Sequence, residues 1–194
     1  LDSFEFKPDV FQIKSTTTPH HWASDRLCED MVMEQKIRLD GHLAILDFSM
    51  QYEGGDHERA RHQEMPALFI DGELKRFFYW KDEQLTEASP RILGENGKEG
   101  QEGLSLGKSS KAWVAYVDEK KHGIGLFTPG TTQFTCYRAL GDGKTGPNGS
   151  ACSYVAPIRT FVLKKGMTLK YRIYLTTGSL QEIQSRFAKI ETVD

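Results

Sequence analysis

The densest group of chemically capable side chains lies at residues 57–64, in the run His-Glu-Arg-Ala-Arg-His-Gln-Glu. Its two histidines are one residue too far apart for the zinc motif H-E-x-x-H, because helix positions five apart point about 140° away from each other. In an extended segment, His62 and Glu64 instead share one side of a strand. That pairing favours acid–base catalysis, and Arg59 or Arg61 beside it favours binding of a substrate carboxylate. The alternative is a solvated loop that leads into the next strand.

A second polar group contains His21, Trp22 and Asp25. An aromatic face stacks on the C–H groups of a sugar, while charged side chains bind its hydroxyls, so this group is typical of a sugar-binding site. The alternative is a tryptophan that closes one end of a β-sandwich among solvated neighbours. Trp80 is a further candidate for substrate binding, because it and Tyr79 must point to opposite sides of a strand and one of them can line a groove.

Several motifs that would indicate other chemistry are missing from the sequence. There is no G-x-S-x-G elbow, and the glycine-rich stretch 140–150 lacks the spacing of a P-loop. The cysteines and histidines do not have the spacing of a zinc site, so we expect no metal and no cofactor. Cys136 and Cys152 flank the glycine-rich stretch and could pair, whereas the alternative is that these two and Cys28 are small buried side chains.

A hairpin is the clearest signal for the elements that must position these residues. Residues 31–39 and 42–52 flank Asp40-Gly41, a pair that favours a two-residue type I′ turn. With that turn, Ile37 pairs with Ala44 on the face toward the core. The outer ends of a hairpin lie side by side, so we expect the segments 20–25 and 59–64 to meet at one end of the sheet, with Trp80 at the edge of the site.

The rest of the chain predicts further short strands and one helix. Asp71-Gly72 is a second candidate hairpin turn, and Ser179 with Glu182 forms a capping box before a short amphipathic helix near the C-terminus. Strands closely spaced between turn residues are typical of an antiparallel β-sandwich. They are expected at 67–70, 74–80, 112–117, 123–127, 133–139, 153–156, 160–163 and 167–176.

The length and composition fit an all-β protein with one β-sandwich domain over residues 1–194. The formal net charge of −2 argues against a binder of nucleic acid, which would need a basic surplus. No apolar run approaches the about 20 residues that cross a bilayer, so we expect no membrane partner. The chain begins at Leu1, and we therefore expect a processed form, or the C-terminal part of a longer protein.

Several short stretches together resemble the galactose-mutarotase-like β-sandwich proteins that process carbohydrates. Those stretches are His21–Asp25, Glu29–Met31, Gln63–Ala67, Trp113–Tyr116, Gly123–Gly130 and Ser153–Pro157. The resemblance implies a supersandwich fold and a function related to glycoside hydrolases or polysaccharide lyases. Proteins of this kind are usually longer, which implies that N-terminal material is missing here.

The expected function is recognition or processing of an oligosaccharide or polysaccharide. If the protein is an enzyme, Glu64 and His62 are the candidate catalytic residues. The candidate substrate-binding residues are His21, Trp22, Asp25, Arg59, Arg61 and Trp80. The alternative is a non-catalytic binding or structural module of a larger protein. The localisation is left open, with the secreted and periplasmic compartments considered.

Overall fold

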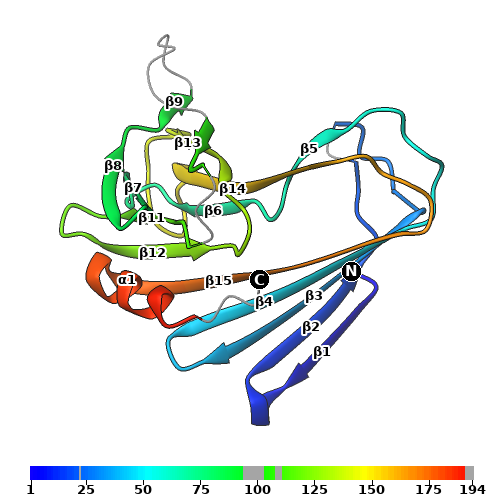
Figure 1. The fold of residues 1–194 in the computed structure, drawn as a ribbon, viewed down its shortest axis with the longest axis horizontal. Helices are drawn as coiled ribbons and strands as arrows, with labels where there is room; N and C mark the ends of the chain where they lie inside the picture. Colours follow the sequence, from blue (N-terminus) through cyan, green and yellow to red (C-terminus); the bar gives the residue numbers. More distant parts are fainter. Residues whose placement is uncertain (22, 94–102, 108–110, 191–194) are drawn as a thin grey trace. The chain divides into compact units, whose positions relative to one another are not determined.

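The structure is a computed structural model that describes residues 1–21, 23–93, 103–107 and 111–190 (Figure 1). The chain divides into two compact units. Unit 1 contains residues Leu1–Arg61 and Thr160–Leu175, and unit 2 contains His62–Arg159 and Thr176–Asp194. The described residues are mainly antiparallel β-strands, as the sequence predicts, and the single domain over residues 1–194 stays a prediction.

Unit 1 is an antiparallel sheet in which β1 is the outer strand and the order is β1-β2-β3-β4-β15 (Figure 1). A 3-10 turn, η1, joins its first two strands. One face carries charged side chains such as the pair Arg172–Asp47, while Phe48 stacks on Tyr171 at 4.9 Å. The elements are β1 (Ser3–Lys7), η1 (Pro8–Val10), β2 (Gln12–Thr17), β3 (Met31–Asp40), β4 (Leu43–Tyr52) and the part of β15 (Met167–Ser179) up to Leu175.

The predicted hairpin is present as β3 and β4, but its turn lies one residue later than expected. Asp40 pairs with Leu43, so the turn residues are Gly41 and His42, and Ile37 faces Leu46 rather than Ala44. Only Gly41 has a positive φ, +56°, which is the pattern of a type II′ turn and not of type I′. Moving the turn by one residue shifts the pairing by two, so every side chain keeps its side of the sheet.

Replacing Gly41 by Val is expected to destabilise the protein by about 1–3 kcal/mol, because valine strongly disfavours the left-handed region. A Cβ at Gly41 would meet no atom within 4 Å, so the cost comes from the backbone and not from a clash. Denaturant unfolding measures the change. Gly55→Val is the matched control, since it also has open space around it but no positive φ. Equal losses in both variants would show that the turn is assigned wrongly.

Unit 2 is a sandwich of two sheets. The first has the order β15-β12-β11-β7-β8, and the second has the order β10-β13-β14-β5, with β6 also on β14 and β9 parallel to β13. The Tyr116 hydroxyl of the first sheet donates to the backbone oxygens of Tyr137 and Tyr154 in the second, at 3.1 and 3.2 Å. Burial raises the pKa of the Tyr116 phenol, so it stays protonated and can donate.

The strands of unit 2 follow several of the predictions, with three corrections. Residues Gln84–Ala88, Arg91–Leu93 and Gly103–Ser105 form strands where none was expected. The strands expected at 153–156 and 160–163 are one strand, which ends at Phe161. The Asp71-Gly72 hairpin is wrong, because β6 pairs with β14 while β7 pairs with β11 and β8. The strands are β5 (Arg61–Glu64), β6 (Leu68–Asp71), β7 (Arg76–Lys81), β8 (Gln84–Ala88), β9 (Arg91–Leu93), β10 (Gly103–Ser105), β11 (Trp113–Val117), β12 (His122–Phe127), β13 (Gln133–Ala139) and β14 (Cys152–Phe161). The first residue of β5 and the last two of β14 belong to unit 1.

The predicted capping box is confirmed at the start of α1 (Leu180–Ala188), the one α-helix among the described residues. The Ser179 side chain accepts from the Glu182 backbone N–H, and the Glu182 carboxylate accepts from the Ser179 backbone. Hydrogen bonding to that backbone lowers the pKa of Glu182. The helix buries Leu180, Ile183 and Phe187, and Gly125 of β12 lies so close to Ile183 that a side chain there would clash.

Candidate functional site

The loop of unit 1 that precedes β3 brings two of the candidate residues together. The His21 backbone N–H donates to Arg26 O at 2.8 Å, and the Asp25 N–H donates to His21 O at 2.8 Å. Asp25 has a φ of +51°, and its carboxylate lies 3.0 Å from Nδ1 of His20. Both partners of that pair are exposed, and such pairs contribute little to stability. Trp22 lies outside the described residues.

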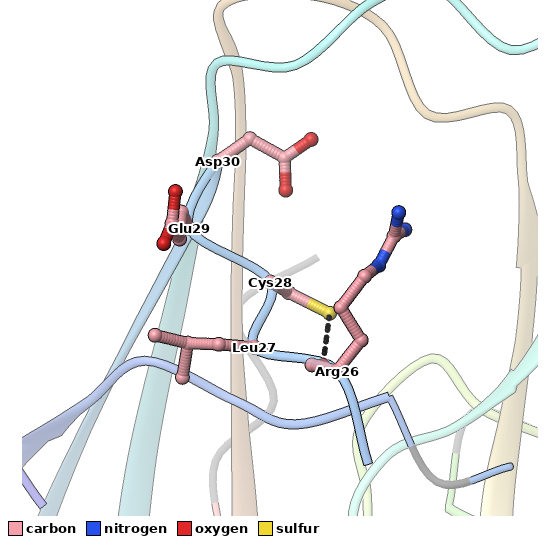
Figure 2. Close-up of a pocket in the computed structure, with 5 residues that line it drawn as sticks. All are labelled: Arg26, Leu27, Cys28, Glu29 and Asp30. Carbon is pink, nitrogen blue, oxygen red and sulfur yellow. Dashed lines mark hydrogen bonds between the residues drawn. The ribbon is translucent and has the colours of Figure 1, made fainter. Parts of the chain in front are cut away.

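An open hollow of about 440 Å³ follows this loop and is lined by residues Arg26–Asp30 (Figure 2). Figure 2 shows the Arg26 guanidinium and the Asp30 carboxylate on the same side of the backbone, and the Cys28 thiol 3.9 Å from Arg26 O. Charged and apolar side chains line the hollow together. Among the described residues that line it, Arg26 to Asp30 offer hydrogen-bonding groups, and none of these five carries an aromatic ring.

The cluster at 59–64 is exposed apart from the half-buried Gln63. Arg61–Glu64 form a strand, so the extended arrangement considered for His62 and Glu64 is present, whereas Arg59 lies in a bend before it. Arg59 and Arg61 belong to unit 1, whereas His62 and Glu64 belong to unit 2 as part of β5. The predicted meeting of this cluster with the segment 20–25 stays a prediction. So do the roles of Arg59 and Arg61 in binding a substrate carboxylate.

Glu64 is the candidate residue that the structure places in a defined chemical setting. The Tyr154 hydroxyl of β14 donates to Oε2 of Glu64 at 2.5 Å, a length typical of a hydroxyl that donates to a carboxylate. The chain holds this geometry through the Met65 backbone N–H, which donates to Pro157 O at 2.8 Å. Glu64 is exposed, while the Tyr154 side chain is buried. The Glu64 carboxylate is therefore oriented by a buried hydrogen-bond donor while the residue stays exposed to solvent.

The strands beside Glu64 place four side chains in one row across the second sheet of unit 2. Arg91 of β9 pairs with Tyr137 of β13, Tyr137 pairs with Tyr154, and Tyr154 pairs with Phe69 of β6. Side chains at paired positions share a face of a sheet. The Tyr137 and Tyr154 rings stack at 4.3 Å, and Phe69 meets Tyr154 edge to face at 4.9 Å.

The row lies on one face of this sheet, and Tyr154 within it is only 2% exposed, so this part of the face is itself covered. The alternate residues Phe134, Cys136 and Val155 are each at most 2% exposed, so they point into the core. The row itself is open at Phe69, whose side chain is 66% exposed. The face therefore combines one fixed carboxylate, two tyrosines, one exposed phenylalanine and one guanidinium.

The electrostatics keep both tyrosines of the row protonated near neutral pH. Burial raises the pKa of the Tyr154 phenol, and the hydrogen bond to the Glu64 carboxylate raises it further. Burial also raises the pKa of Tyr137, with Cys152 and Glu64 adding to the effect. Tyr154 is therefore a donor that orients Glu64, and the charge on this part of the face belongs to the carboxylate.

The loop at 140–150 is closed by two aspartates. The Asp142 carboxylate accepts from the backbone N–H groups of Lys144 and Ser150 at 3.1 and 3.0 Å, which lowers the pKa of Asp142. Asp71, at the end of β6, accepts from the backbone N–H groups of Glu73 and Gly146 at 2.9 and 2.6 Å. Both oxygens of Asp71 thus hold backbone in place, which assigns this carboxylate a structural role.

Trp80 stacks on Trp113 with the rings 6.2 Å apart, and it is half-buried in the first sheet of unit 2. Cys136 and Cys152 lie at positions of β13 and β14 that point to opposite faces, so the pairing considered from the sequence is wrong. Burial raises the pKa of the Cys136 thiol to about 12.

Two classes of site have no counterpart among the described residues. Within 1–21, 23–93, 103–107 and 111–190, no group of three or more His, Cys, Asp or Glu side chains is arranged to hold a metal ion. In the same ranges, no helix has the length and apolar character needed to cross a membrane.

The comparison with solved structures decides the fold. A galactose mutarotase related enzyme from Lactobacillus acidophilus superposes with a TM-score of 0.51 at 11% identity, over 91% of this chain and 71% of that chain. A galactose mutarotase-like protein from Lactobacillus casei gives 0.51 at 11% identity, over 90% and 72%. The chain has the galactose mutarotase-like fold. At identities this low, the similarity to these two structures concerns the fold and not the activity.

A third solved structure that shares the fold is a xanthan lyase. Paenibacillus xanthan lyase superposes with a TM-score of 0.50 at 8% identity, over 92% of the mutarotase-like chain and 16% of the lyase. No family model matches the sequence, and no curated protein matches it. The sequence resemblance to carbohydrate-processing β-sandwich proteins is thus confirmed at the level of the fold.

The sequence predicts Glu64 as a site residue but does not identify the groups around it. Tyr137 and Tyr154 are visible in the sequence as strand aromatics, which are usually core residues. Arg91 and Phe69 carry no signal of their own, because they join the row only through the pairing of β9 and β6 with distant strands. Alternation in residues 133–137, where Phe134 and Cys136 are the apolar alternates, could have indicated that Tyr137 leaves the core side, whereas residues 152–157 do not alternate and give no such signal for Tyr154.

Proposed function

We propose that this mutarotase-like chain binds and processes a carbohydrate on the face that carries Glu64, Tyr154, Tyr137, Arg91 and Phe69. The observation that carries the proposal is the solvent-exposed Glu64 carboxylate, which accepts a 2.5 Å hydrogen bond from the buried Tyr154 hydroxyl. One oxygen is oriented by a donor, and the carboxylate stays open to a ligand. Such a group can accept a proton from a sugar hydroxyl or from an acidic C–H.

Elimination fits this face better than hydrolysis does. A glycosidase of the common type uses two carboxyl groups about 5–9.5 Å apart. On the strands beside Glu64, the carboxylate of Asp71 is already occupied with backbone N–H groups. A lyase needs one base and one cation instead. Glu64 would remove the proton next to a uronate carboxylate, the C–H electron pair would form the double bond as the glycosidic C–O bond breaks, and the leaving oxygen would take up a proton from water, to which Glu64 later returns its own.

Arg91 supplies the cation that this reaction requires. It stands next to Tyr137 in the row, and a guanidinium pairs with a carboxylate through two parallel hydrogen bonds. Neutralising the uronate carboxylate makes the neighbouring proton more acidic. We therefore assign Glu64 as the base, Tyr154 as its positioning residue and Arg91 as the group that binds the substrate carboxylate.

A screen of soluble polysaccharides tests the proposal. Polygalacturonate, alginate, xanthan and galactan are incubated with the protein, and new reducing ends and the absorbance of unsaturated products are measured. Free galactose is followed by polarimetry for mutarotation. Unsaturated ends from a uronate polymer are the expected result. Reducing ends without unsaturation would replace elimination by hydrolysis, and mutarotation alone would replace it by epimerisation at the anomeric carbon.

A non-catalytic binding module is the second candidate. The observation that favours it is that the chain matches only 16% of the xanthan lyase, so the same fold also forms a small part of a much larger enzyme. Binding to a polysaccharide of the panel with no product of any kind would select this candidate. Trp22→Ala and Arg61→Ala, measured in the same binding assay, test the remaining predicted contacts.

A further inference from the structure

The exposed ring of Phe69 is not explained by the packing of unit 2. Phe69 follows Glu64 closely in the chain and belongs to β6, which pairs with β14 from Leu68 to Asp71. Its side chain is 66% exposed, although its partner Tyr154 is only 2% exposed. Single exposed aromatic rings are common on protein surfaces, so the exposure of Phe69 matters only because the ring lies directly beside the Glu64–Tyr154 pair, where it offers a face for stacking.

Glu64 and Phe69 touch different ends of the same tyrosine. Glu64 accepts the hydrogen bond of the Tyr154 hydroxyl, whereas Phe69 contacts the Tyr154 ring edge to face at 4.9 Å. They belong to separate strands, β5 and β6, which are joined by Met65-Pro66-Ala67 and both pair with β14. A ligand that reaches both residues must therefore extend along β14.

We infer that Phe69 forms a sugar-stacking subsite beside the Glu64–Tyr154 pair, and that the site therefore binds a chain of at least two sugar residues. This inference rests on the proposed function and adds the length of the ligand to it. One sugar ring lies at Glu64, and the next lies against the exposed face of Phe69. The apolar C–H side of a pyranose covers the ring and removes it from water.

Calorimetric titration with galacturonic acid and with its linear tetramer tests the subsite. Phe69→Ala should raise the Kd for the tetramer by about 3–10-fold, the scale of one aromatic contact. The Kd for the single sugar should stay unchanged. Phe69→Trp keeps a stacking face and should retain tetramer binding. Phe6→Ala is the matched control, because Phe6 is 55% exposed but lies in β1 of unit 1.

The outcomes separate the subsite from the proposed function. If Phe69→Ala changes neither Kd while Glu64→Gln weakens binding, the subsite is wrong and the proposed function stands. Equal losses for the single sugar and the tetramer would also overturn the subsite, because Phe69 would then belong to the position at Glu64. If neither sugar binds the unaltered protein, the subsite and the proposed function are both overturned for uronate ligands.

Discussion

Glu64→Gln is expected to lower the turnover of a uronate polysaccharide by about 10²–10⁴-fold, the usual contribution of a general base. Glutamine has nearly the same shape and keeps an oxygen that can accept from the Tyr154 hydroxyl. The substitution therefore removes the charge and the basicity while the hydrogen bond remains. The initial rate of formation of unsaturated ends, measured at saturating substrate, gives the change.

Glu73→Gln is the control for this result. Glu73 is an exposed carboxylate of the same unit, and its backbone N–H, not its side chain, makes the contact to Asp71. Its substitution should leave turnover unchanged. The melting temperatures of both variants should stay within a few degrees of the parent protein. If Glu64→Gln retains full turnover, Glu64 is not the base, and the neighbouring His62 becomes the residue to substitute next.

Trp113→Ala is expected to cost about 3–5 kcal/mol of unfolding free energy, the usual range for removing a large buried aromatic side chain. Trp113 is 2% exposed and stacks on Trp80 at 6.2 Å. It also meets Phe187 of α1 with the ring centroids 5.7 Å apart. The substitution leaves a cavity between strand β7 and the helix, which neighbouring side chains fill only in part.

Denaturant unfolding, followed by far-ultraviolet circular dichroism because that signal comes from the backbone, measures the loss of unfolding free energy in Trp113→Ala. Phe69→Ala serves as the comparison, because it also truncates an aromatic side chain in unit 2 but one that is 66% exposed. It should lose far less stability than Trp113→Ala. Similar losses in the two variants would contradict the assignment of Trp113 to the core and of Phe69 to the solvated face.

Local sequence signals predicted those elements whose stability depends on nearby residues. The capping box at Ser179 and Glu182 fixed the start of α1, because its hydrogen bonds join residues three apart. The hairpin of β3 and β4 was also predicted, and the grouping of its side chains by face stayed the same when the turn moved by one residue. The burial of the two faces was predicted only in part, because Met33 of the expected core face is 37% exposed and Ile45 of the expected wet face is 4% exposed. In the observed turn, Gly41 is the first turn residue and has a positive φ, and His42 is the second turn residue and does not. This pattern differs from the type I′ turn that was expected at Asp40-Gly41.

Local sequence patterns did not predict which distant strands pair with each other. Asp71-Gly72 has the composition of a hairpin turn, yet β6 pairs with β14 and β7 pairs with β11. The β1–β2 hairpin was also missing from the prediction. A turn sequence limits the backbone conformation of two residues, but burial and pairing along a whole strand decide which strand becomes the neighbour.

The sequence by itself determined the all-β class, the C-terminal helix and the choice of Glu64 as a candidate catalytic residue. Only the tertiary structure placed Tyr154 against Glu64, although the two are 90 residues apart in the chain. It also assembled Arg91, Tyr137, Tyr154 and Phe69 into one row. The reason is physical: alternation sets the side of a strand to which a residue points, while register with distant strands sets which side chains it meets.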